Sequence, residues 1–219
     1  MPRLLFEKTG NAVWISHLDL MRLFQRAFKR AGLPLKHTQG FNPRPSVSIA
    51  LPLSVGVESR CELLDFDLVD CTADNAEIKR LLNEKLVDGI QVLDVYDNGR
   101  KTGLISLLNC QILLKYDKGL PEGACDRIAA LFNADEVIVP KKTKSGIQEQ
   151  NIIPMIRRIS VAEAGEKEVM IDALICCQNP TLNPAQLAAA IDRYLPDNSP
   201  DGVSYKRLEI YDSSEMIFR

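Results

Sequence analysis

The sequence has few of the residues from which metal and nucleophilic sites are usually built. Its 219 residues include one tryptophan, two histidines (His17 and His37) and six scattered cysteines with no CxxC spacing. A structural zinc site or a cysteine-bound iron–sulfur cluster is therefore not expected within this chain, and we expect no metal or other cofactor. Most of the cysteines are expected to be small core residues, which is the usual role of a free cysteine.

Several segments that would indicate a location or an enzyme class are also missing. No apolar run is long enough to span a bilayer, and the start of the chain does not resemble a secretory signal peptide. We therefore expect a cytoplasmic protein with no membrane contact. The sequence has no glycine-rich phosphate loop of the Walker or Rossmann type and no GxSxG elbow, which argues against the enzyme classes that depend on these motifs.

The charge of the chain is small overall but unevenly distributed. The net charge is −2, and 46% of the residues are apolar, as in an ordinary globular protein. Residues 1–60 contain nine Lys/Arg and three Asp/Glu, which leaves +6, whereas residues 61–100 contain four and ten, which leaves −6. The chain is therefore no general nucleic-acid binder by composition, but its first part can present a local positive surface.

The stretch from Ile15 to Val55 carries most of that positive charge and organises the first part of the chain. Ser16 followed by Asp19 is a typical helix start, and Gly32 is a typical helix end. Between them the apolar residues fall on one face at helical spacing, which predicts that this face packs against a core. The basic residues fall together on the other side, as a stripe formed by Arg22, Arg26, Lys29 and Arg30.

The helix is followed by a loop, residues 39–45, that is too stiff to be an ordinary connector. Pro43 and Pro45 restrict its backbone, and Gly40 permits a sharp turn. The loop thus presents its side chains in fixed directions beside the basic helix, where they could hold a polyanion. The candidate contacts here are Lys36, Phe41, Asn42 and Arg44. The alternative is that Phe41 plugs the core and the charges are only solvated.

The order of the predicted elements is β-α-β-β-α-β, and it occurs twice. In the first half, strands are expected at 4–8, 46–52, 61–69 and 90–96, and helices at 17–31 and 72–86. In the second half, strands are expected at 107–116, 136–140, 167–178 and 205–211, and helices at 123–132 and 183–194. The predicted fold class is α+β, with two tandem ferredoxin-like units built on antiparallel sheets.

The predicted domains are residues 1–98, with the basic helix and the GFNP loop, and residues 104–219. The polar, glycine-containing segment 97–103 separates them. The second domain carries a basic insertion at about 141–166, whose tip contains Lys141, Lys142 and Lys144. These lysines could supplement the phosphate contacts of the first helix, although charged tips are commonly only solvated.

Two groups of residues are candidates for catalysis. His17 lies in the first turn of the basic helix, where it could act as a general base on a ribose hydroxyl while Arg22 or Arg26 steadies the phosphate. The structural alternative is a histidine that hydrogen-bonds its neighbours. Asp65 and Asp67, two residues apart on a strand, could share an acid–base role, but a solvated strand face is the simpler interpretation.

Three motifs in the first 65 residues resemble the N-terminal signature of the bacterial "radical SAM-linked" family, a domain of unknown function. They are Ser16-His17-Leu18-Asp19, Arg30-Ala31-Gly32-Leu33-Pro34, and Gly40-Phe41-Asn42-Pro43 followed by Ala50-Leu51-Pro52-Leu53. The resemblance implies a partner, because such proteins are typically encoded beside, or fused to, a radical S-adenosylmethionine enzyme. This chain lacks the CxxxCxxC motif of that enzyme. A second resemblance, in fold only, is to the CRISPR repeat-processing endoribonucleases.

Three functional hypotheses follow from the sequence. The first is an accessory protein that binds structured RNA, ribosomal or transfer RNA, and presents it to a radical SAM modification enzyme on a separate chain. The second is a metal-independent endoribonuclease or RNA-processing enzyme that uses His17. The third is a protein-interaction subunit whose basic face docks on such an enzyme without RNA. We expect a non-catalytic partner rather than an enzyme.

Overall fold

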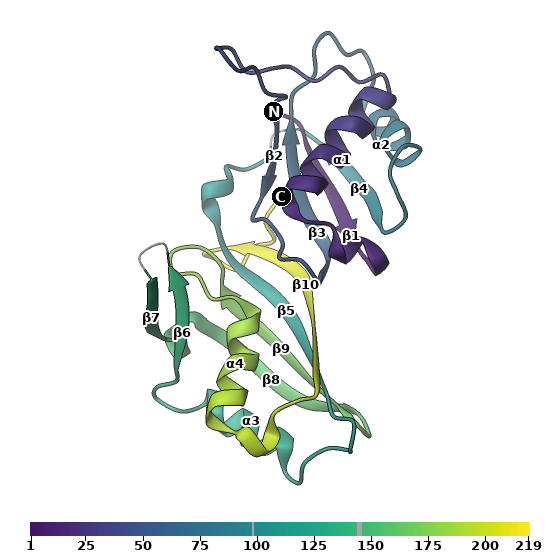
Figure 1. The fold of residues 1–219 in the computed structure, drawn as a ribbon. Helices are drawn as coiled ribbons and strands as arrows, with labels where there is room; N and C mark the ends of the chain where they lie inside the picture. The colour runs from purple at the N-terminus through teal and green to yellow at the C-terminus, as the bar shows by residue number, and fades with distance from the viewer. Residues whose placement is uncertain (98, 144–145) are drawn as a thin grey trace. The chain divides into compact units, whose positions relative to one another are not determined.

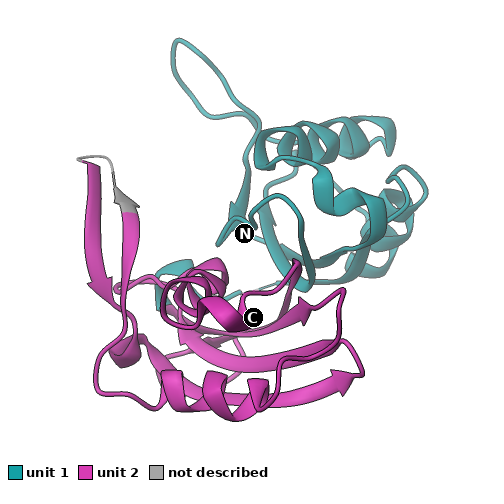
Figure 2. Cartoon of the chain, turned by 60° about the horizontal axis from the view of Figure 1, so that its bottom comes forward, with its two compact units in different colours: residues 1–104, 219 teal, residues 105–218 magenta. Residues whose placement is uncertain are grey.

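A computed structural model describes residues 1–97, 99–143 and 146–219, and of Lys142 and Thr143 it describes the backbone alone. The described residues form a mixed α+β structure with four α-helices and antiparallel strand pairings. The chain divides into two compact units, residues 1–104 together with Arg219 and residues 105–218 (Figure 2). No helix in the described ranges is both long enough and apolar enough to cross a membrane.

The described residues of the first unit form two α-helices and four strands (Figure 1). In chain order they are β1 (Arg3–Lys8), a 3₁₀ helix (Gly10–Trp14), α1 (His17–Arg30), β2 (Val47–Ala50), β3 (Val57–Phe66), α2 (Asn75–Asn83) and β4 (Ile90–Tyr96), with a further 3₁₀ turn at Thr102–Leu104. The strands lie in the order β4-β1-β3-β2. The chain order β-α-β-β-α-β predicted for this half is confirmed.

The core of the first unit lies between this sheet and its two helices. The apolar face predicted for α1 is buried, and the rings of Phe6 and Phe24 meet edge to face with 4.8 Å between their centroids. The rings of Phe28 and Phe66 lie 5.0 Å apart. Ile78 and Leu82 bring α2 into the same cluster. Because one face of α1 is committed to this core, its basic residues are left on the solvent side.

The ends of α1 are fixed by local interactions that the sequence predicted. The Ser16 hydroxyl accepts a hydrogen bond from the Asp19 backbone N–H at 3.3 Å and donates one to the Asp19 carboxylate at 2.8 Å. Gly32, just past the helix, has φ +71°, a left-handed conformation in which a side chain would be strained. The helix therefore ends where the chain turns away into the next segment.

The second unit contains the other two helices (Figure 1). Its elements are β5 (Ile105–Lys115), α3 (Ala124–Phe132), β6 (Ile138–Thr143), β7 (Gly146–Asn151), a 3₁₀ turn (Ile153–Met155), β8 (Ile156–Gly165), β9 (Glu168–Cys176), α4 (Pro184–Tyr194), a 3₁₀ turn (Pro196–Asn198) and β10 (Gly202–Asp212). The sheet strands lie in the order β10-β5-β9-β8. Among the described residues, β6 and β7 pair with each other as a separate two-stranded sheet.

The segment between α3 and β9 differs from the sequence expectation. Of the strand expected at 136–140, only residues 138–140 are in a strand; they belong to β6, which pairs with β7 outside the main sheet. Residues 156–165, expected to be insertion, form β8 and pair with β9. The composition of β8 explains why the sequence pattern did not indicate a strand there. β8 has no paired neighbour on its outer side in the described sheet and holds Arg157, Arg158 and Glu163, so its apolar alternation is weak.

The reactivity of the cysteines tests how far the interior of the protein excludes solvent. Four of the six thiols are buried, and burial raises the pKa of both Cys110 and Cys177 to about 12. At pH 8 their thiolate fraction is roughly one in 10⁴, so we expect a thiol reagent to modify native Cys110 and Cys177 very slowly. Cys71 and Cys125, which are half-buried, should react first. Mass spectrometry after timed labelling measures this, with urea-unfolded protein, in which all six react, as the control.

Candidate functional site

A long hairpin-like loop, residues 35–46 and called the arm below, projects from the first unit after α1 (Figure 1). The Thr38 N–H donates to the Arg44 carbonyl at 2.8 Å, and the Ser46 N–H donates to the Lys36 carbonyl at 2.7 Å. At its base the arm is tied to the segment after β3 by hydrogen bonds from Lys36 N–H to the Asp67 carbonyl and from Asp67 N–H to the Ser46 carbonyl. The loop predicted to be stiff is therefore the tip of a hydrogen-bonded ribbon.

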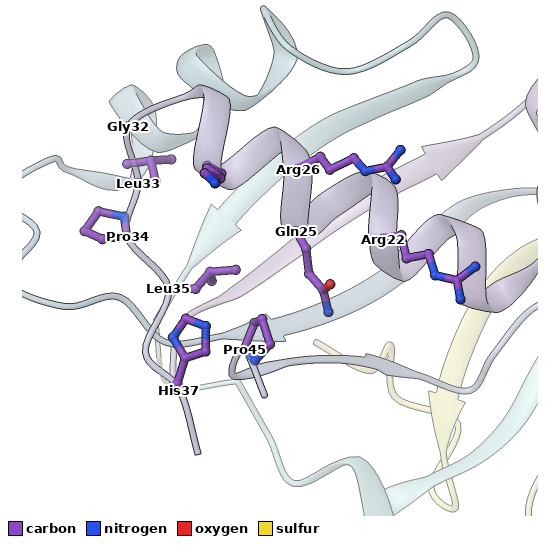
Figure 3. Close-up of a pocket in the computed structure, with 10 residues that line it drawn as sticks. Arg22, Gln25, Arg26, Gly32, Leu33, Pro34, Leu35, His37 and Pro45 are labelled. Carbon is purple, nitrogen blue, oxygen red and sulfur yellow. The ribbon is translucent and has the colours of Figure 1, made fainter. Parts of the chain in front are cut away.

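A pocket with a volume of about 790 Å³ lies between α1 and the base of this arm (Figure 3). The helix contributes its polar face, and the chain after it contributes mainly apolar side chains. The lining residues are Arg22, Gln25, Arg26, Lys29, Gly32, Leu33, Pro34, Leu35, His37 and Pro45. The geometry thus joins part of the predicted basic stripe to the predicted loop.

Three of the four residues of the basic stripe line this pocket, namely Arg22, Arg26 and Lys29, and all three are exposed. Arg22 also forms an exposed ion pair with Asp19, at 3.0 Å, and the hydrogen bonds from Ser16 and Arg22 hold the pKa of the Asp19 carboxyl below its usual value. Such an exposed pair is weak and leaves the guanidinium available to another anion.

Arg30, the fourth residue of the stripe, has a different partner. Its guanidinium donates a hydrogen bond of 2.8 Å to the carbonyl of Lys85, which follows α2. It lines a smaller hollow of about 470 Å³, together with Arg22, Arg26 and Val87, whose lining includes no residue of the arm. Arg30 therefore joins α1 to the end of α2, a role that the helical spacing did not indicate.

The candidate residues on the arm are all exposed. The Phe41 ring at the tip is fully exposed, so the alternative that it plugs the core is wrong. Lys36, Asn42 and Arg44 are exposed as well, and the Arg44 N–H donates to the Thr38 hydroxyl at 3.0 Å. The arm thus presents an aromatic ring and two cations to solvent.

The two histidines lie in different places. His17 is half-buried at the start of α1 and does not line the pocket. His37 is exposed on the arm, pairs with Pro45 across the ribbon and does line the pocket. Sequence reasoning preferred His17 because of the helix N-terminus. The sequence analysis did not identify His37 as a site residue. His37 reaches the pocket only because the arm folds back, and no local sequence pattern indicates this fold.

The predicted basic tip of the second unit is only partly described. The Lys141 ammonium donates a hydrogen bond of 3.1 Å to the Thr181 carbonyl, within the same unit. For Lys142 only the backbone, in β6, is described, and Lys144 lies outside the described residues. Lys141 is therefore partly engaged in holding the β6–β7 hairpin.

Asp65 has a structural partner. Its carboxylate accepts two hydrogen bonds from the Arg3 guanidinium, at 2.5 and 3.1 Å, across the β1–β3 pairing. The Arg3 side chain is 3% exposed and that of Asp65 20%. Asp67, in turn, lies beyond the end of β3. Within the described part of the chain no three His, Cys, Asp or Glu residues come together as a metal site.

Comparison with known proteins identifies the family. The model of the family described as uncharacterised proteins conserved in bacteria, DUF2344, matches residues 2–184. The chain belongs to this family. The match covers the basic helix, the arm and the pocket, so the site lies within the DUF2344 region. No curated protein matches the chain.

Solved structures similar to this DUF2344 protein include the following two. One is a chain of a Cbf5–Nop10–Gar1 complex, with a TM-score of 0.52 and 10% identity over 95% of this chain. This chain spans about half, 48%, of that protein's length, and at such identity the likeness concerns the fold alone. The other is an unknown protein from Galdieria sulphuraria, with a TM-score of 0.26 and 11% identity over 94% of this chain and 95% of that one.

Proposed function

We propose that this protein is an RNA-binding accessory factor that holds structured RNA, ribosomal or transfer RNA, and presents it to a radical SAM enzyme on a separate chain. One observation carries the RNA-binding part, namely that Arg22, Arg26 and Lys29 are exposed along one face of α1 and share a pocket with the arm. The radical SAM partner is the expectation from the sequence motifs of α1 and the arm.

The spacing of the three cations supports contact with a phosphate backbone. Residues 22, 26 and 29 span two turns of α1, about 10 Å along its axis. Arginine and lysine in such a row can contact successive phosphates, and these contacts position an RNA without reading its sequence. The exposed Phe41 ring at the tip of the arm supplies a surface on which an unpaired base can stack.

The proposal also takes both units to be ferredoxin-like. What supports this is the strand order in each, β4-β1-β3-β2 in the first and β10-β5-β9-β8 in the second, with the β6–β7 hairpin as an insertion after α3. The central strands are β1 and β3 in the first unit and β5 and β9 in the second. In both units each helix lies in the chain between two strands of the sheet. The fold alone does not fix the function, so the proposal depends on the site.

The test is a binding titration of the full chain with bulk tRNA and with ribosomal RNA fragments at two salt concentrations. We expect the double variant Arg22→Gln/Arg26→Gln to bind roughly tenfold or more weakly. The slope of log K against log salt should fall by about 1.4 to 1.8, the share of two phosphate contacts on single-stranded or duplex nucleic acid. The matched control is Arg60→Gln/Arg80→Gln, which removes two exposed arginines of the same unit outside the pocket.

Equal losses of affinity in both double variants would show that only net charge matters, and would contradict a site on α1. If the wild-type protein bound no RNA at low salt, the RNA proposal would be wrong. Binding to a radical SAM enzyme in the absence of RNA, lost in the first variant and kept in the second, would then favour the docking subunit.

A further inference from the structure

The pocket between α1 and the arm has two chemically different parts. The chain after α1 contributes an apolar wall of Leu33, Pro34, Leu35 and Pro45, whereas α1 contributes the cations of Arg22, Arg26 and Lys29. The described lining contains no carboxylate. A ligand that fills the pocket should therefore carry an apolar surface on one side and negative charge on the other.

We infer that this pocket holds one unpaired nucleotide of the bound RNA, an inference that rests on the proposed function. The base would lie against Leu35 and Pro45 while its flanking phosphates meet Arg22, Arg26 and Lys29. A volume of about 790 Å³ is within the usual range for small-molecule sites, roughly 300–1,000 Å³, so a single nucleotide fits with room for water. Unpaired bases are the parts of RNA that proteins read most often.

Gln25 is placed to recognise the edge of such a base. It is half-buried on α1, one turn after Arg22 and directly before Arg26, and its side chain extends toward Pro45 (Figure 3). An amide offers both a donor and an acceptor, so it can pair with the edge of any base. His37, across from it on the arm, adds a flat ring for stacking (Figure 3). The pocket should thus prefer an unpaired nucleotide without a strict base preference.

An acidic peptide is the competing occupant. Its carboxylates could pair with the cations of α1. Its charged, flexible side chains would make poor contacts with the apolar wall of Leu33, Leu35 and Pro45. A nucleotide satisfies both parts, because the apolar faces of its base and its charged phosphates are held at a fixed separation. The charge complementarity and the apolar wall together favour RNA.

The experiment compares two RNAs with the full chain, a 20-base-pair duplex and the same duplex with one bulged nucleotide. We expect the wild-type protein to bind the bulged RNA about tenfold more tightly. Gln25→Trp, which fills the pocket without changing charge, should reduce this ratio to about one. The matched control is Gln91→Trp on β4, an exposed glutamine outside the pocket, which should keep the ratio.

A second readout does not depend on a variant. With 2-aminopurine as the bulged base, its emission should rise when the wild-type protein draws it out of the stack, and unchanged emission would overturn the inference. Equal affinity for both RNAs, or a ratio unaffected by Gln25→Trp, would do the same while leaving the RNA-binding function intact. No binding of either RNA would remove both proposals. Tighter binding of poly-glutamate than of bulged RNA, abolished by Gln25→Trp, would assign the pocket to a peptide.

Discussion

Replacing Phe24 with alanine is expected to lower the free energy of unfolding by about 3–5 kcal/mol. The Phe24 ring is fully buried in the core of the first unit and packs edge to face on Phe6, with 4.8 Å between the centroids. The loss combines the transfer energy of the ring with the cavity it leaves between α1 and the sheet. Urea unfolding followed by far-UV circular dichroism, and by the fluorescence of Trp14 in the same unit, measures this change.

Leu18→Ala is the matched control for this prediction. Leu18 is on the same helix but largely exposed, so its truncation should change the free energy of unfolding by no more than about 0.5 kcal/mol. Similar losses for Phe24→Ala and Leu18→Ala would contradict the orientation of α1, and with it the direction in which Arg22 and Arg26 point.

Asp65→Ala is expected to cost about 3 kcal/mol of folding free energy. The substitution leaves the Arg3 guanidinium, whose side chain is 3% exposed, without the carboxylate that accepts two of its hydrogen bonds. A buried charge that loses its partner is destabilising by roughly 3–5 kcal/mol, and the partial exposure of Asp65 places the effect at the lower end. The same urea titration measures it.

The control for Asp65→Ala is Glu84→Ala, which breaks the exposed pair of Glu84 with Arg80 on α2. An exposed pair of this kind contributes about 0.3–0.5 kcal/mol. If Asp65→Ala were as mild as Glu84→Ala, the Asp65–Arg3 pair would contribute no more to stability than an exposed ion pair. If Asp65→Ala abolished RNA binding without loss of stability, a functional role for this carboxylate would return.

The first helix shows how much of the fold was readable from the sequence. Ser16, Asp19 and Gly32 mark its ends through local chemistry, and Phe24 and Phe28 mark its buried face through a spacing that any amphipathic helix shares. These signals involve residues within a few positions of one another. For that reason the helix, its basic stripe and the order of elements in the first unit could be predicted.

The parts that could not be predicted depend on residues far apart in the chain. Arg30 belongs to the stripe by spacing, yet it bonds to the carbonyl of Lys85, 55 residues away. His37 and Pro45 join Gln25 in one pocket only because the arm folds back toward α1. β8 was missed because a charged strand has little apolar alternation from which to recognise it. Each case requires the tertiary structure.

The base of the arm and its tip are expected to tolerate mutation differently, because only the base is needed for folding. Its base is fixed by hydrogen bonds between backbone groups, including Val69 N–H to the Pro34 carbonyl, while its tip from Gln39 to Arg44 is exposed throughout. Side chains at the tip can therefore change with little effect on folding. A lineage could thus adapt the arm to a different ligand by point mutation while the sheet and helices beneath it stay as they are, which makes the tip a natural place for divergence and for directed evolution.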